Sequence, residues 1–267
     1  MTAGLGVLFA VLYVLGSRRL VRPRDRWRRA ACFALSLALV ELVLDPPFDG
    51  WADTSLAAHM LQHVVLMSFV PPLAVLAAPW VPIWRGLPLG LRRPLAHGVV
   101  ALPGVVKGAL RGCVSPVPAF LLVTVDLGVW HVPSLYDLTL RNEAVHDLEH
   151  LSFLVFGILF WIPVLDSPPL HRRLDDLRAA FYVTGGAATG WVLGVVLALA
   201  TSPLYPAYAE LPRRLGGISA VADQQLAAGV MIGLGAIPPS VAVFVLLYRW
   251  LGRGELRGKP LGLVQSR

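Results

Sequence analysis

The sequence predicts an all-α polytopic membrane protein: one bundle of about seven transmembrane helices, with the N-terminus outside and the C-terminus in the cytoplasm. Three observations predict this class, namely the composition, the lengths of the apolar stretches and the distribution of basic residues. Hydrophobic residues make up 56% of the chain, charged residues only 15%, and the mean hydropathy is +0.67. A soluble globule with this balance would expose large apolar patches, whereas a lipid bilayer covers them.

Several apolar stretches come close to the roughly 20 residues that a helix needs to cross about 30 Å of hydrocarbon. We expect one span from each stretch, and in chain order they run approximately over residues 3–17, 30–44, 55–81, 114–131, 144–165, 179–201 and 223–251. The segments between them are short to moderate in length, without a low-complexity run or a soluble module. Residues 1–267 are therefore expected to form a single transmembrane domain.

The orientation follows from the basic residues, because short cytoplasmic loops retain positive charge during insertion. Only three of the 23 lysines and arginines, Arg141, Arg213 and Arg214, fall in segments that are then outside. The others fall in four cytoplasmic segments, residues 18–29, 82–112, 167–178 and 249–267. The pI near 10.0 reflects arginines that face anionic headgroups, so the lipid bilayer is an expected partner and nucleic acid is not.

Two stretches need separate arguments. The first span, 3–17, is similar to the apolar core of a signal peptide, but its arginines follow it instead of preceding it, which indicates a retained helix. Residues 94–110 are apolar enough to suggest an eighth span. A crossing there would invert the downstream topology and erase the charge bias, and Pro103, Lys107 and the short length favour an interfacial or re-entrant segment.

Five of the seven histidines lie at the outer ends of predicted spans. His59 and His63 open the third span in HMLQH, His131 closes the fourth in VWHVP, and His146 and His150 open the fifth in HDLEH. In each HxxxH the imidazoles lie one helical turn apart on the same face, so their ring nitrogens can converge on one ion. Histidines also form interhelical hydrogen bonds, but two pairs and a fifth histidine on one leaflet favour a metal or cofactor site.

Carboxylates near the histidines are candidates for ligands or for groups that orient them. Asp126 lies about 7 Å inward of His131 along the fourth span, at about 1.5 Å per residue. Glu149 lies inside the second HxxxH, and Asp223 begins the seventh span beside Gln224. A helix N-cap is an equally good interpretation of Asp223.

The residue types leave the metal and the chemistry open, because imidazole suits copper, zinc, iron and nickel. Met60 adjoins the first pair, where a thioether would favour Cu(I), although methionine in a membrane helix is usually packing material. An alternative function is a seven-span zinc-dependent hydrolase in which His63, His146 and His150 with Asp126 activate water. A permeation protein for copper or protons and a haem-binding bundle are further hypotheses.

The segments that carry these residues resemble the CtaG-type cytochrome c oxidase assembly factor family, the multi-span kind of Gram-positive bacteria. The resemblance covers AAHMLQHVVLMSFVPPLAVLAAP at 57–79, WHVPSLYDLTLRN at 130–142, VHDLEHLSFLVFGILFWIP at 145–163 and DQQLAAGVMIGLG at 223–235. The residues that match the family's motifs are His59, Gln62, His63, Trp130, His131, Tyr136, Asp137, His146, Glu149, His150, Asp223 and Gln224.

This resemblance implies a multi-pass protein of the bacterial plasma membrane that takes part in the maturation of an aa-type terminal oxidase. It points to copper as the metal, with zinc and haem as open alternatives, and to no catalytic residue. The implied partners are oxidase subunits in the membrane, to which an outer-leaflet histidine cluster would hand copper. The sequence leaves open whether the protein forms a homodimer.

Overall fold

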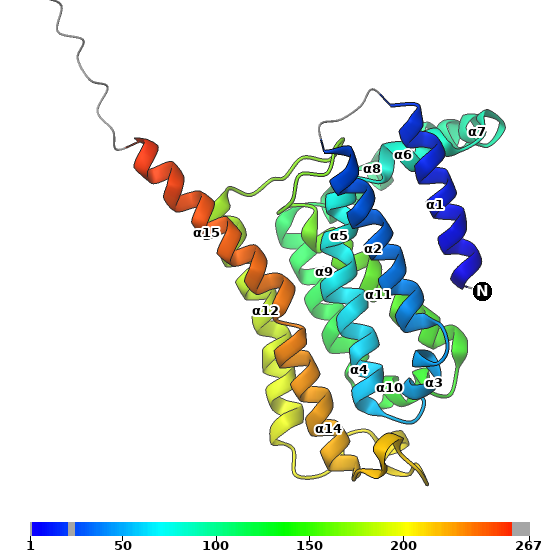
Figure 1. Ribbon diagram of the computed structural model, residues 1–267, viewed down its shortest axis with the longest axis vertical. Helices are drawn as coiled ribbons and strands as arrows, with labels where there is room; N and C mark the ends of the chain where they lie inside the picture. The colour runs from blue at the N-terminus through cyan, green and yellow to red at the C-terminus, as the bar shows by residue number, and fades with distance from the viewer. Residues whose placement is uncertain (1, 21–24, 258–267) are drawn as a thin grey trace, which may run out of the picture.

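The computed structural model describes residues 2–20 and 25–257, which are all-helical without a strand (Figure 1). The predicted all-α class is therefore confirmed. By length and composition, four helical segments are able to cross a membrane, and a bent pair of helices would make a fifth span. The four segments are Leu56–Ala77, Glu143–Trp161, Asp176–Leu199 and Ala220–Arg253. They coincide with four of the predicted spans, whereas the full set of seven stays a prediction.

Three described helices precede the first of these spans. Helix α1 (Thr2–Arg18) packs against α6 (Trp80–Gly86), and their backbones meet so closely that a Cβ at Gly16 would collide with the carbonyl oxygen of Pro82. Helix α2 (Arg26–Leu44) packs against α5 (Val70–Ala77). The short helix α3 (Phe48–Ala52) follows α2 and contacts the beginning of the third predicted span.

That span is continuous but not uniform. Helix α4 (Leu56–Val64) passes through a π-helical turn, η1 (Val65–Phe69), into α5, which ends at Ala77. A π-helical turn inserts one extra residue into the helix and is frequently found at functional sites. The predicted end at residue 81 is too late, because Ala78 adopts a left-handed conformation, φ 47°, and α6 begins at Trp80.

Residues 94–110 fall in two helices, α7 (Leu89–Ala101) and α8 (Gly104–Cys113), neither of which contains a buried side chain. Helix α8 meets α9 (Pro116–Trp130) at 74°. This bend is compatible with a broken span as well as with a re-entrant loop, so the interfacial or re-entrant placement of residues 94–110 stays a prediction.

The second half of the chain contributes the remaining helices: α10 (Pro133–Thr139), α11 (Glu143–Trp161), α12 (Asp176–Leu199), α13 (Pro206–Ala209), the 3-10 turn η2 (Leu215–Gly217), α14 (Ala220–Gly229), the π-helical turn η3 (Val230–Leu234) and α15 (Ile237–Arg257). Figure 1 shows α3, α10 and the start of α14 at one end of the bundle, and α6, α7 and α8 at the other. The predicted outer segments that contain α3 and α10 thus lie at the opposite end of the bundle from the basic segment 82–112.

Candidate metal centre

Three histidines and one glutamate from two helices form a compact group near the end of the bundle that carries α3 and α10. His59 comes from α4, and His146, Glu149 and His150 come from the first two turns of α11. Each residue offers one ligand atom, and these four atoms all lie within 4.8 Å of one another. Three of the side chains are buried and His146 is half-buried. Imidazole nitrogens and a carboxylate oxygen at such separations form a donor set that suits a transition metal.

The hydrogen bonds of His59 determine which ring nitrogen is available. The hydroxyl of Tyr208 donates to the carbonyl oxygen of Ala52 at 2.6 Å and lies 2.9 Å from Nδ1 of His59. Burial raises the pKa of Tyr208 well above its usual value, so the hydroxyl keeps its proton. Since that proton is used on Ala52, Nδ1 of His59 must donate to the hydroxyl oxygen, which leaves the Nε2 lone pair free.

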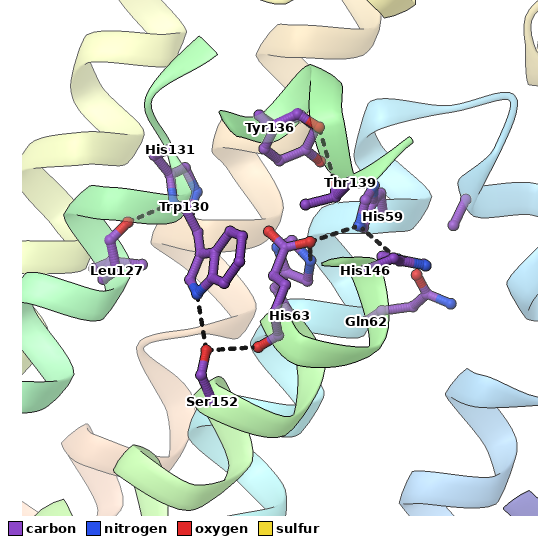
Figure 2. Close-up of polar contacts among 12 residues, drawn as sticks. His59, Gln62, His63, Leu127, Trp130, His131, Tyr136, Thr139, His146 and Ser152 are labelled. Atoms are coloured by element: carbon purple, nitrogen blue, oxygen red, sulfur yellow. Dashed lines mark hydrogen bonds and ion pairs between the residues drawn. The ribbon is translucent and has the colours of Figure 1, made fainter. Parts of the chain in front are cut away.

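The Nε2 lone pair of His59 faces a second imidazole and accepts a hydrogen bond from it. This nitrogen lies 3.2 Å from Nε2 of His146, which belongs to the other helix (Figure 2). Two ligands at about 2.0–2.1 Å from a tetrahedral metal are separated by about 3.3 Å. The spacing of these two nitrogens therefore already matches one edge of a tetrahedral site.

Glu149 is fully buried and has no hydrogen bond to either carboxylate oxygen. Its Oε2 lies 3.6 Å from Nε2 of His63 and 3.8 Å from Nε2 of His59. Within the described part of the chain, no lysine or arginine forms an ion pair with it. A buried carboxylate costs several kcal/mol unless it is protonated or meets a cation. The surroundings of Glu149 thus favour the binding of a cation among the imidazoles.

His63 and His131 lie beside the four-residue group rather than within it. The ring of His63 is 4.4 Å from that of His59 and 6.4 Å from that of His131, measured between centroids. Nδ1 of His131 donates to the carbonyl oxygen of Leu127 at 2.8 Å, so its Nε2 carries the lone pair and has no partner (Figure 2). The structure thus brings the five predicted histidines together in two adjoining parts.

Asp126 lies behind the histidines and not among the grouped ligand atoms. Its Oδ1 accepts a hydrogen bond of 2.9 Å from the indole Nε1 of Trp130, and the same nitrogen lies 2.8 Å from the hydroxyl of Ser152. Ser152 in turn donates to the carbonyl oxygen of Glu149 at 2.9 Å. This chain of contacts joins α9 to α11 and holds the helix that carries Glu149.

Asp223 and Gln224 position the backbone around the site. Both carboxylate oxygens of Asp223 bind the start of α4, where Ser55, Leu56 and Ala57 donate to them at 2.8, 2.8 and 3.1 Å. Asp223 therefore caps α4, although it belongs to α14. Gln224 accepts from the backbone nitrogen of Leu204 at 2.7 Å and so fastens the segment that leads to Tyr208.

Gln62 also has a positioning role. Its Nε2 donates to the carbonyl oxygen of Val43 at 2.7 Å and to Oδ1 of Asp49 at 3.2 Å, so it ties α4 to α2 and α3. Met60 is fully buried between these motif residues.

Two tyrosines complete the surroundings: Tyr208, which orients His59, and Tyr136, whose ring lies 5.1 Å from that of His59. Tyr208 was missed from the sequence because no motif or periodicity connects it to a histidine 149 residues away.

A polar cavity of ≈ 270 Å³ adjoins the group on the side of α3 and α10. His59 and His146 form part of its wall, together with the acidic side chains of Asp49, Asp53 and Glu143. The basic side chain of Arg141 also lines it, so its carboxylates outnumber the guanidinium by three to one. The carboxylates attract cations, and the two imidazoles lie where the cavity meets the buried group. The cavity is therefore a suitable approach for a metal ion.

Comparison with known proteins points to one family. The family model described as cytochrome c oxidase caa3 assembly factor matches residues 11–253. Uncharacterized proteins of Mycobacterium bovis and Mycobacterium tuberculosis are each 24% identical over 249 residues, and one of Mycobacterium leprae is 22% identical over 254 residues. These matches cover 91–92% of this chain but only 38% of each relative. No solved structure matches the chain.

Proposed function

Because the chain belongs to the cytochrome c oxidase caa3 assembly factor family, we propose that it supports oxidase maturation by binding copper at the histidine cluster. The observation that carries the proposal is the convergence of His59, His146, Glu149 and His150, whose ligand atoms lie within 4.8 Å of one another. Copper is the cargo here. Imidazole nitrogens bind it well, and the buried Glu149 would offset part of its charge.

The polar cavity adjoins the histidine cluster, and this arrangement supports a direction for copper uptake. Copper would be attracted by Asp49, Asp53 and Glu143 in the polar cavity and would first meet His59 and His146, which border it. Tyr208 holds His59 in the tautomer whose Nε2 is free for the ion. An orienting partner of this kind is worth about 10–100-fold in metal affinity.

The arrangement in the membrane is part of the proposal. Seven spans with the N-terminus outside would place the cluster in the outer leaflet of the bacterial plasma membrane, within lateral reach of oxidase subunits. Labelling of a cysteine introduced in the loop 132–143 tests this orientation. An impermeant reagent added from outside should react with it in intact cells, and protection from the reagent there would reverse the assigned topology.

The zinc-hydrolase alternative receives no support from the placement of Asp126. This carboxylate is engaged by Trp130 instead of facing the grouped ligand atoms. Family membership also favours an assembly role over catalysis. The two functions nevertheless differ in the metal they need, so one measurement separates them.

The test is elemental analysis of the protein purified through a tag that binds no metal. Near-stoichiometric copper after growth in copper-replete medium is the expected result, and His59→Ala and His150→Ala should each lose it. His171→Ala is the matched control, since His171 is exposed and far from the cluster in sequence. Stoichiometric zinc would favour the hydrolase instead, and a metal-free protein under copper-replete conditions would refute both functions.

A further inference from the structure

A second cavity, of ≈ 100 Å³, lies on the other side of the histidine cluster and differs from the first in its chemistry. His63 and His131 are in its wall, and from there it extends past Phe160 and Trp161, at the far end of α11 from His146. Its remaining lining is almost entirely apolar, and no carboxylate contributes to it. The cluster thus separates an acidic cavity from an apolar one.

The methionines of the chain gather around this apolar cavity. The sequence has four methionines, and the three that the structure describes all line it: Met60, Met67 and Met231. They come from different parts of the chain, Met60 from α4, Met67 from the π-helical turn η1 and Met231 from the π-helical turn η3. Two helical irregularities therefore each present a thioether to the same space.

Two imidazoles with ring nitrogens that lack a hydrogen bond line the same cavity. His63 is only 4% exposed, and neither of its ring nitrogens has a hydrogen bond. His131 is 7% exposed, and its Nε2 has none. Buried polar atoms normally have a partner, because an unsatisfied one costs about 1–3 kcal/mol. Imidazole nitrogens without a hydrogen bond line this cavity beside three thioethers. Such a lining indicates a ligand that binds both nitrogen and sulfur.

We infer that this cavity is a second metal site, specific for Cu(I), whose donors are drawn from His63, His131 and the thioethers of Met60, Met67 and Met231. Thioethers are soft ligands that select Cu(I) over divalent ions. All five candidate donors are neutral when the histidines are unprotonated, so a bound ion keeps its own charge. A monovalent ion is the least costly one to hold in an apolar cavity without a carboxylate.

The inferred site adjoins the cluster closely enough to exchange an ion with it. The ring of His63 lies 4.4 Å from that of His59 and 5.4 Å from that of His150. His63 therefore belongs to both sites. It lies 3.6 Å from Glu149 of the cluster, and it lines the cavity that the methionines surround. The inference rests on the proposed copper function, since the cluster would supply the Cu(I) that enters this cavity.

The experiment uses the full chain with Cys32 and Cys113 replaced by serine. Both cysteines are free and only partly buried, so serine is a mild change that removes thiol ligands. The protein is labelled with selenomethionine, loaded anaerobically with Cu(I) from its acetonitrile complex and measured by X-ray absorption at the copper and selenium edges. The expected result is copper–selenium scattering besides the nitrogen scattering of imidazole.

The matched variant carries Met60→Leu, Met67→Leu and Met231→Leu, which preserve volume and hydrophobicity and so are tolerated by a packed bundle. This variant should lose the copper–selenium scattering. It should also bind Cu(I) at least about 10-fold more weakly in competition with a Cu(I) chelator. Its affinity for Zn(II), which prefers the imidazole–carboxylate group, should be unchanged. A methionine that only packs would produce neither the selenium signal nor this selectivity.

The outcomes separate the two proposals. Bound copper with nitrogen scattering alone, and equal Cu(I) affinity in the triple variant, would overturn the thioether site while leaving the histidine cluster intact. A protein that binds no copper in any form would overturn both. If the triple variant fails to accumulate, the selenium-edge spectrum of the protein with its methionines in place decides the question without it.

Discussion

Glu149 and Asp176 are both buried carboxylates, but they lie at opposite ends of the bundle and have different neighbours. Asp176 is 1% exposed, and Arg172 and Arg253 approach its oxygens at 2.6 and 2.7 Å. Glu149 is equally buried, yet among the described residues no arginine or lysine pairs with it, and the imidazoles of His59 and His63 lie 3.8 and 3.6 Å from its Oε2. The fold itself neutralises Asp176. At Glu149 the neutralising charge has to come from a proton or a bound cation, which distinguishes a structural ion pair from a binding site.

The largest effect is expected when an imidazole near Glu149 is removed, which tests whether this end of the bundle is a binding site. His63→Ala and His150→Ala should each abolish terminal oxidase activity in cells while the protein stays inserted and abundant, because alanine removes a ligand and also an unsatisfied buried polar group. Activity and immunoblotting of membranes measure the two effects.

His171→Ala is the control and should behave like the parent protein. Disappearance of the alanine variants from the membrane would mean that the histidines are structural. Partial rescue by excess copper in the medium is expected, because mass action compensates for reduced affinity.

Glu149→Gln tests whether the carboxylate of Glu149 serves copper binding or stability. It keeps the shape of the side chain and removes its charge, so copper affinity should fall by at least about 10-fold, because even the outer partners that only orient a ligand are worth about 10–100-fold. The metal-free protein should be at least as stable as the parent, because a buried carboxylate without a cationic partner is replaced by a neutral group. Chelator competition and thermal unfolding in detergent measure both quantities. A clear loss of metal-free stability would contradict the interpretation of Glu149 as a binding group.

Asp176→Asn should give the opposite pattern. The change leaves Arg172 and Arg253 without their carboxylate, and we expect a loss of about 1–2 kcal/mol, moderated because Arg253 is half-exposed to its surroundings. Copper affinity should not change. Unchanged copper affinity with a lower unfolding temperature would show that Asp176 stabilises the fold without affecting the metal site. Weaker copper binding would instead show that the two ends of the bundle are coupled.

The smallest effect is expected from Tyr208→Phe, which removes only the hydroxyl that orients His59. Copper affinity should fall by about 10-fold, the lower end of the effect of an orienting partner, since Nδ1 of His59 loses its acceptor and the ring becomes free to change tautomer. Tyr205→Phe is the control at a neighbouring buried tyrosine, whose hydroxyl contacts the carbonyl oxygen of His131 instead. An equal loss in both variants would indicate a general effect of the loop.

Much of the site was predictable because the ligands repeat at helical spacing. His59 and His63, and likewise His146 and His150, lie four residues apart, and a helix places such residues on one face whatever surrounds it. Glu149 was predicted for the same local reason. The helical class was predictable from apolar stretches, since a bilayer requires the backbone to satisfy its own hydrogen bonds.

Other features depended on contacts between distant segments. Asp223, for which the sequence left a metal-site role and an N-cap equally open, caps α4, which begins 167 residues earlier in the chain. No local pattern distinguishes that role from a cap on its own helix, because the side chain is the same and only the neighbouring helix differs. The π-helical turns that present Met67 and Met231 were also not predicted, since one extra residue in a turn leaves the apolar pattern almost unchanged.

By itself the sequence determined that the chain is helical, that its apolar stretches suit a membrane, and which histidines share a face, because these properties depend on composition and on spacing along one helix. Only the tertiary structure decided which histidines join Glu149 and which line the apolar cavity. It also decided that Tyr208 orients His59, and that three methionines from separate segments surround one space. These relations arise where helices pack, and the geometry between helices is set by side chains far apart in the sequence.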